Sequence, residues 1–174
     1  MFQVEDGPCH NVLVTYFSHS GNTRSVAQLL REKTCGVLYG VEPRKIYSKR
    51  NVIQEAVQEI REGHLPPLKH AVPTMYSYDY VLVGGPVWED TLPSPLMSFL
   101  RDADFKGKKV AAFCIHDGNP GTFLPDFKNL ARNADILDGL ELPSVRRNTA
   151  DALETTLSSW LAGLGLVKPL ATAV

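Results

Sequence analysis

Segments typical of buried strands alternate with segments typical of amphipathic helices along almost the whole chain. This alternation constrains the fold more than any other feature of the sequence. The expected strands are 11–17, 37–43, 78–84, 109–116 and an edge strand at 136–142. The expected helices are 23–33, 51–62, 94–100, 122–133 and 149–164. The order predicts a doubly wound α/β fold of three layers, in which helices cover both faces of a parallel sheet.

Length and charge limit the class of protein. The chain has 174 residues, which suits a single domain over 1–174 with its core at about 11–164. A net charge of −1 argues against nucleic acid or an anionic membrane as the main partner. No apolar run approaches the roughly 20 residues that a membrane span needs. Residues 1–10 carry acids and lack an apolar core, so they predict a loose N-terminal arm rather than a signal peptide, and we expect a cytoplasmic protein.

The cysteines give no sign of a disulfide framework or a metal site. The chain contains an odd number of cysteines, Cys9, Cys35 and Cys114, and none of them forms a CxxC pair. Cys114 falls within an expected strand, so we expect it to be a small core residue. The histidines are equally scattered, without the spacing of metal ligands.

The clearest functional signal is a polar turn between the first expected strand and the first expected helix. The turn consists of Ser18, His19, Ser20, Gly21, Asn22 and Thr23. The first amides of a helix lack intrahelical partners and lie at the positive end of its dipole, and hydroxyls add further donors. Such a turn suits an anion, although an ordinary N-cap gives a similar pattern.

Two further loops leave the third and fourth expected strands. The second loop, 84–93, begins with two glycines and a proline and carries Trp88 in a polar setting. An indole in that place either stacks on a ligand or folds down as a lid over the following helix. The third loop, 116–122, contains Gly118 and Gly121, which suggest amides presented to a ligand or a plain turn. In a doubly wound sheet the ligand lies beyond the carboxyl ends of the strands, so we expect the three loops to converge.

Together these loops resemble those of the flavodoxin-like family. The run Ser18-His-Ser-Gly-Asn-Thr23 is similar to the flavodoxin phosphate loop. The run Gly84-Gly-Pro-Val-Trp88, with Thr91-Leu-Pro93 after it, resembles the second flavin loop of the shorter bacterial flavodoxin-like proteins. The resemblance extends over roughly 11–164. It implies a five-stranded sheet of order 2-1-3-4-5 and a bound FMN.

The resemblance also implies which residues hold the cofactor. The phosphate would lie on Ser18, His19, Ser20, Gly21, Asn22 and Thr23, held by hydroxyls, amides and the helix dipole rather than by a lysine clamp. The flavin ring would lie against Gly85, Pro86, Val87, Trp88, Glu89, His116, Asp117, Gly118 and Gly121, with Trp88 stacked on one face. The protein would then place and tune the flavin, which performs the redox chemistry. Glu89, Asp90 and Asp117 would lower the potential of the second electron if they lie near the ring, and would have no effect if they point to solvent.

The sequence departs from the family in three respects. Acids stand at Glu89 and Asp90, where close relatives carry an aromatic residue or glycine. The third loop has no aromatic residue of its own, only His116 at its start and Phe123 beyond its end. Carrier flavodoxins tend to be strongly acidic, whereas this chain is nearly neutral.

Several functions remain open at this point. The first is electron transfer, either as a carrier that serves a redox partner protein or as a small reductase of quinone-like acceptors. A flavodoxin fold without cofactor, acting as an interaction or regulatory module, is the alternative. A receiver domain is excluded because Phe17-Ser18 and Gly84-Gly85 stand where it needs acids. A Walker nucleotide site and a Ser-His-Asp hydrolase lack their residues.

Overall fold

The computed structural model describes residues 10–48, 50–144 and 149–167. Its centre is a sheet of parallel strand pairs in the order β2-β1-β3-β4-β5. The strands are β1 (Val12–Tyr16), β2 (Val37–Gly40), β3 (Tyr80–Pro86), β4 (Lys109–His116), β5 (Asp135–Ile136) and β6 (Leu140–Pro143). The predicted α/β class and the strand order are confirmed.

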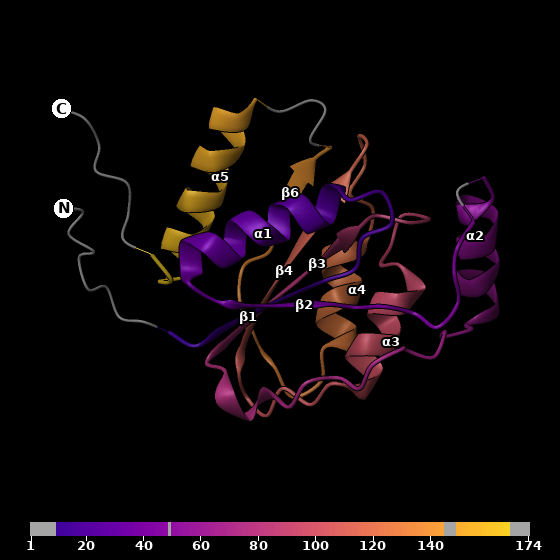
Figure 1. Cartoon of the computed structure of the whole chain (residues 1–174), viewed down its shortest axis with the longest axis horizontal. Helices are drawn as coiled ribbons and strands as arrows, with labels where there is room; N and C mark the ends of the chain where they lie inside the picture. Colours follow the sequence, from indigo (N-terminus) through magenta and orange to yellow (C-terminus); the bar gives the residue numbers. More distant parts are fainter. Residues whose placement is uncertain (1–9, 49, 145–148, 168–174) are drawn as a thin grey trace.

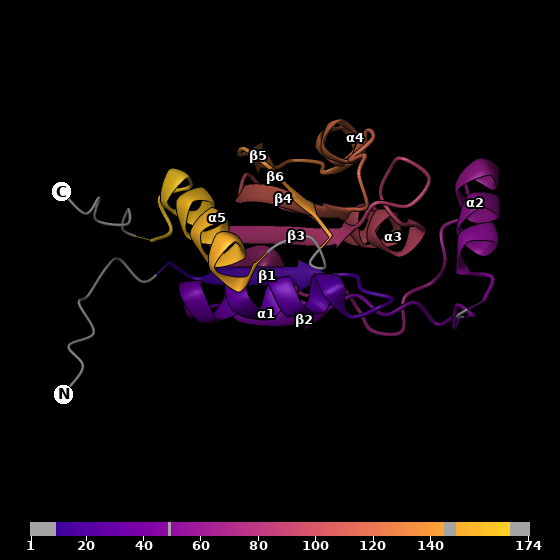
Figure 2. The same ribbon diagram turned by 90° about the horizontal axis from the view of Figure 1, so that it is seen from above.

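Helices cover both faces of the sheet, as predicted. The helices are α1 (Asn22–Thr34), α2 (Val52–Glu62), α3 (Ser94–Asp102), α4 (Phe123–Leu130), α5 (Ala150–Gly163) and a short 3-10 helix at Met75–Ser77. Figures 1 and 2 show α1 and α5 on one face and α3 and α4 on the other. Successive strand side chains point to opposite faces, so Leu13 packs in the core under α3 and α4, while Val14 packs in the core under α1 and α5. No helix in the described part of the chain is long and apolar enough to cross a bilayer.

Helix α2 lies beyond the carboxyl ends of the strands instead of on a sheet face (Figures 1 and 2). Its apolar residues recur at helical spacing, a pattern typical of a core-facing helix. However, the buried residues of α2 are only Ala56 and Glu59, and Ile53 is 67% exposed. A helix at this end of the sheet stands beside the loops that follow β1, β3 and β4.

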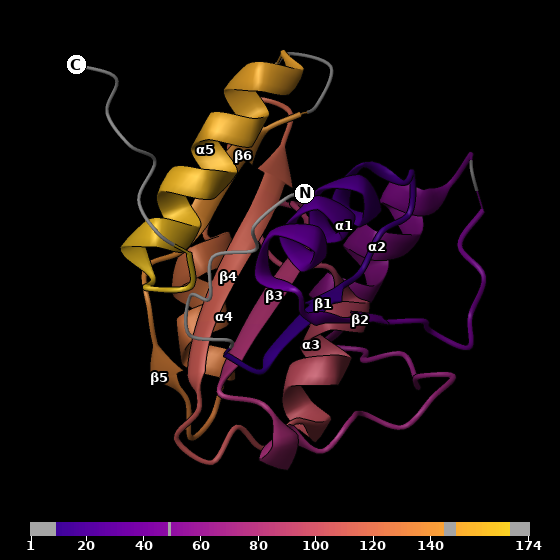
Figure 3. The same ribbon diagram turned by 60° about the vertical axis from the view of Figure 1, so that its left-hand side comes forward.

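The predicted edge strand is interrupted. Val110 of β4 pairs with Ile136, whereas Phe113 pairs with Leu140. Between these two pairs, β4 advances by three residues and the segment from β5 to β6 advances by four. The edge segment therefore contains one extra residue, which is a β-bulge. The bulge puts Ile136 and Leu140 in opposite cores, whereas an uninterrupted strand over 136–142 would place both side chains on one face. Figure 3 shows β5 and β6 along the same edge of β4.

Strand β3 is longer at its carboxyl end than predicted. Gly84 and Gly85 continue the strand and pair with Phe113 and Cys114 of β4. A Cβ at Gly84 would lie 1.9 Å from the Phe113 ring, so this glycine makes room for a core side chain. Gly84 was the last residue of the predicted strand, so the expectation of a loop was wrong for Gly85 and Pro86, which lie in β3. In the N-terminal arm predicted for 1–10, residues 1–9 lie outside the described residues.

Candidate functional site

The loops after β1, β3 and β4 converge at the carboxyl end of the sheet, as predicted, and together with α2 and the end of β6 they enclose a pocket of about 530 Å³. Its volume falls in the range usual for sites that bind cofactors and other small molecules. The residues that line it are His19, Ser20, Asn22, Thr23, Ile53, Ala56, Pro86, Val87, Trp88, Glu89, Asp90, Ile115, His116, Asp117, Asn119 and Ser144.

The first loop forms a compact turn at the N-terminus of α1. Gly21 occupies the N-cap position with φ of 95°, a left-handed conformation that glycine adopts without a steric penalty. Its amide donates to the Ser18 hydroxyl over 3.1 Å. Ser20 and Asn22 line the pocket, and so does Thr23, which is 1% exposed. The pocket therefore meets the free amides and hydroxyls of a helix N-terminus.

The second loop turns within two residues and projects Trp88 against aromatic neighbours. Trp88 and Thr91 exchange backbone hydrogen bonds of 3.0 Å, and both residues between them are left-handed, with φ of 47° at Glu89 and 60° at Asp90. The half-buried indole meets Phe17 and Tyr47 nearly edge-on, at centroid distances of 5.1 and 5.3 Å. These rings restrict Trp88 to one side of the pocket.

The third loop holds this turn in place. The Asp90 carbonyl accepts from the Thr122 amide at 2.6 Å and from the Thr122 hydroxyl at 3.2 Å. The Asp90 carboxylate accepts from the Asn119 side chain at 3.3 Å. A Cβ at Gly121 would lie 2.0 Å from the Asp90 carbonyl oxygen, so only glycine permits this approach. These contacts offset the cost of two left-handed residues that are not glycine.

Two amides of the third loop are engaged within the loop itself. The Gly118 amide donates to His116 Nδ1 at 3.2 Å, and the Gly121 amide donates to the Asn119 side chain at 3.0 Å. The described hydrogen bonds thus direct both amides to neighbouring side chains. Phe123, the aromatic residue that follows the loop, is fully buried in the core.

The lining is poor in positive charge. Its titratable residues are His19, Glu89, Asp90, His116 and Asp117, and none of the described lining residues is lysine or arginine. An anion in this pocket would therefore depend on amides, hydroxyls and the α1 dipole. Cys114 precedes the lining residue Ile115 in β4 and lies in the core under α3 and α4, where burial raises the pKa of its thiol to about 12.

The pocket brings together most of the residues that the sequence singled out. Those in its lining are His19, Ser20, Asn22, Thr23, Pro86, Val87, Trp88, Glu89, His116 and Asp117. Ser18, Gly21, Gly85, Gly118 and Gly121 lie behind the lining and shape the loops or the strand. Asp90, considered above only as a possible influence on the flavin potential, also lines the pocket, and the residues that sequence reasoning missed are Ile53, Ala56, Ile115, Asn119 and Ser144. No local motif marks Ile53 and Ala56, because only the position of α2 brings them to the pocket.

Solved structures that share this fold include proteins described as flavoproteins and flavodoxins. A protein from Bacteroides eggerthii DSM 20697, described as a flavoprotein, is 25% identical with a TM-score of 0.77, over 91% of this chain and 99% of that one. A similarly described protein from Bacteroides uniformis ATCC 8492 is 22% identical with a TM-score of 0.74, over 83% and 96% of the two chains.

A third structure was solved with a ligand. The flavoprotein from Lactobacillus acidophilus NCFM, in complex with FMN, is 21% identical with a TM-score of 0.67, over 76% of this chain and 93% of that one. A comparison with curated proteins finds no match. A model of the flavodoxin family matches residues 11–140, which is more than half of the chain. The chain therefore belongs to the flavodoxin family.

Proposed function

We propose that the chain binds FMN in this pocket and acts in electron transfer, as a carrier for a redox partner protein or as a small reductase of quinone-like acceptors. The proposal depends on one observation above all. The hydroxyl-rich turn at the N-terminus of α1 and the half-buried Trp88 line the same pocket. Membership of the flavodoxin family supports it, and so does the similarity to a Lactobacillus acidophilus flavoprotein that binds FMN.

The phosphate would lie at the N-terminus of α1. Ser20, Asn22 and Thr23 line this part of the pocket and supply hydroxyl and amide donors. The helix dipole adds to their attraction for an anion. This donor set fits a phosphate ester without a lysine clamp.

The flavin ring would lie between the second and third loops. Trp88 offers an aromatic surface, while Ile53 and Ala56 of α2 supply apolar surface that excludes water. Glu89 and Asp117 bring negative charge to the mouth of the same pocket. Bound FMN supplies the redox chemistry, and the chain orients it and controls access.

Reconstitution of the purified protein with FMN tests cofactor binding. We expect a yellow protein with the paired absorption bands of bound flavin and saturation at one FMN per chain. A colourless protein that takes up no FMN would favour the cofactor-free interaction module instead. Stopped-flow mixing of the reduced protein with a quinone or with a one-electron protein acceptor then separates a reductase from a carrier.

A further inference from the structure

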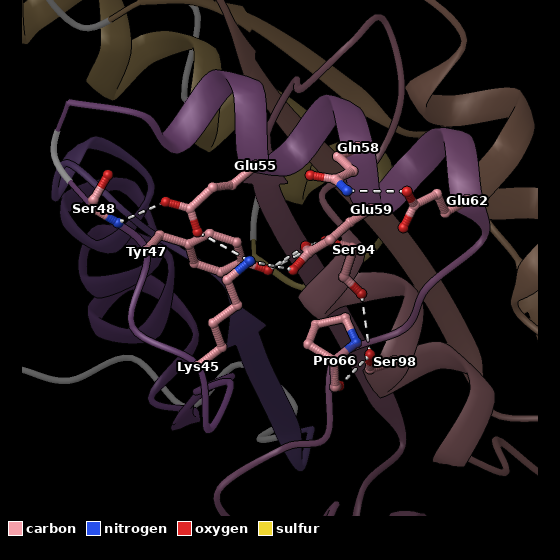
Figure 4. Close-up of polar contacts among 10 residues, drawn as sticks. All are labelled: Lys45, Tyr47, Ser48, Glu55, Gln58, Glu59, Glu62, Pro66, Ser94 and Ser98. Carbon is pink, nitrogen blue, oxygen red and sulfur yellow. Dashed lines mark hydrogen bonds and ion pairs between the residues drawn. The ribbon is translucent and has the colours of Figure 1, made fainter.

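A buried carboxylate joins three segments beside the pocket. Glu59 of α2 is 5% exposed. Its Oε2 accepts hydrogen bonds from the Tyr47 hydroxyl at 2.6 Å and from the Ser94 hydroxyl at the start of α3. Its Oε1 pairs with Lys45 Nζ at 3.1 Å. Figure 4 shows the three donors converging on this one carboxylate.

Among the described contacts, the other attachments of α2 are at Glu55, which pairs with Lys45 at 3.0 Å and accepts from the Ser48 amide at 3.4 Å, and at Val52, which packs against the core under α3 and α4. The buried residues of α2 are Ala56 and Glu59, so Glu59 is the one that carries a polar group. After the helix, the chain is held again at Pro66, whose carbonyl accepts from the Ser98 hydroxyl at 2.7 Å. Ser94 and Ser98 are one turn apart on α3, so α3 holds α2 and its following segment along one face (Figure 4).

The same network reaches the pocket by two routes. The Tyr47 ring meets Trp88 nearly edge-on, with 5.3 Å between centroids and 79° between planes. Ala56, which lines the pocket, is three residues before Glu59 and therefore shares its side of α2. Ile53, one turn earlier, lines the pocket as well.

The direction of the Tyr47 hydrogen bond is well defined. Burial, and then the hydrogen bond to Glu59, raise the pKa of the Tyr47 phenol well above its ordinary value. The phenol thus stays protonated and donates to the carboxylate. The Lys45 side chain is 41% exposed, so its ion pair with Glu59 contributes little to stability, and geometric specificity accounts better for the buried carboxylate.

We propose that Glu59 is a positioning residue for the ring-binding part of the pocket. It orients Tyr47, whose ring supports Trp88, and it anchors α2 so that Ile53 and Ala56 close the pocket. This inference rests on the proposed function, since the ligand whose ring is positioned is FMN.

The experiment compares four variants with the parent protein. Glu59→Ala removes the carboxylate, and Tyr47→Phe removes a single donor while keeping the ring. Glu59→Gln keeps an acceptor oxygen for the hydroxyls. The matched control is Glu62→Gln, because Glu62 lies on the same helix, is exposed, and accepts only from Gln58 among the described contacts.

The readouts are the affinities for FMN and riboflavin and the emission of Trp88 in the apoprotein, measured in a Trp160→Phe background. Glu59→Ala and Tyr47→Phe should weaken both flavins by the same factor, at least about fivefold, because a buried hydrogen bond to a carboxylate is lost. They should also shift the Trp88 emission. Glu59→Gln should recover most of the loss, and Glu62→Gln should match the parent.

Other outcomes would overturn the proposal. If the variants lower the melting temperature but keep both affinities and the Trp88 emission, Glu59 has only a structural role. A loss of FMN binding with riboflavin unaffected would place its effect at the phosphate. If the parent takes up no FMN, the proposed function fails, while an unchanged Trp88 emission in Tyr47→Phe would separately refute the positioning of Trp88. Tyr47→Phe keeps the test decisive if Glu59→Ala does not fold.

Discussion

At the scale of the residue, the pocket combines neutral donors at one end with an indole at the other. Ser20 and Thr23 stand at the N-terminus of α1, and Trp88 stands on the turn after β3. In the proposed mode of binding these side chains meet different ends of an FMN molecule, so substitutions should separate phosphate binding from ring binding.

The phosphate end is tested by the double variant Ser20→Ala, Thr23→Val. We expect FMN to bind far more weakly and riboflavin to bind nearly as before, because each lost hydrogen bond to a charged group costs about 1.5–3 kcal/mol. Ser25→Ala is the control, since the exposed Ser25 hydroxyl donates to the Gly21 carbonyl within the same turn. Calorimetric titration with both ligands gives the comparison. Equal losses for the two would place the phosphate elsewhere.

The ring end is tested at Trp88. If the indole stacks on the flavin, bound FMN should be nearly dark, and Trp88→Ala should restore its fluorescence at a cost of about 1–3 kcal/mol in affinity, by analogy with base stacking. Trp160→Phe serves as the control because Trp160 packs on Phe113 in the core under α1 and α5. A Trp88→Ala protein that binds tightly and stays dark would instead favour a lid role for Trp88.

The acidic mouth of the pocket is tested at Glu89. Two unit charges about 6 Å apart repel by nearly 3 kcal/mol at an effective dielectric of about 20, and salt reduces this value. We therefore expect Glu89→Gln to raise the potential of the second electron, most clearly at low salt. Glu32→Gln changes an exposed residue far along α1 and should leave the potential of the second electron unaltered. Identical potentials for Glu89→Gln and the parent at both salt concentrations would dismiss Glu89 as a tuning residue.

At the scale of the element, the contact between the second and third loops depends on the missing side chain of Gly121. Gly121 has φ of 57° and Gly63, at the end of α2, has φ of 62°, so alanine meets the same backbone preference at both positions. Only at Gly121 does a Cβ meet another group, the Asp90 carbonyl at 2.0 Å.

We therefore expect Gly121→Ala to weaken FMN and to destabilise the protein more than Gly63→Ala, which should cost about 1–2 kcal/mol of stability for its left-handed backbone and leave the affinity unchanged. Urea unfolding and flavin titration of the two variants measure the difference. Equal effects would mean that the loop contact adjusts without loss.

At the scale of the whole molecule, the free energy of unfolding should depend on pH through Cys114. Burial raises the pKa of its thiol to about 12 in the folded protein, above the ordinary value of 9.0. The unfolded chain then loses this proton first as the pH rises. The contribution of the Cys114 thiol to the free energy of unfolding is fully present below about pH 9 and declines toward pH 12. It amounts to up to about 1.4 kcal/mol for each pKa unit that separates the folded from the unfolded state.

Denaturant unfolding of the parent and Cys114→Ala at several pH values from 8 to 11 checks this. The variant is less stable throughout because of its cavity, yet its stability should fall less steeply with pH. Cys35→Ala, which removes an exposed thiol, should show the same dependence of the free energy of unfolding on pH as the parent. Parallel slopes for Cys114→Ala and the parent would contradict the expectation.

The sequence by itself determined the α/β class, the resemblance that implied the strand order, and the three loops that meet at the pocket. These depend on local patterns, such as buried runs of β-branched residues and the polar turn from Ser18 to Thr23. Parallel strands bring their carboxyl ends to one edge whatever packs around them, so local patterns suffice.

Only the tertiary structure decided where α2 lies, that β3 continues through Gly85 and Pro86, and that the edge strand bulges. It also placed Ile53 and Ala56 in the pocket and joined Glu59 to Tyr47 and Ser94. Each of these results from contacts between residues distant in the sequence. The amphipathic pattern of α2 shows that the helix has an apolar side but not what that side meets, and Gly84 is explained by the Phe113 ring on the neighbouring strand.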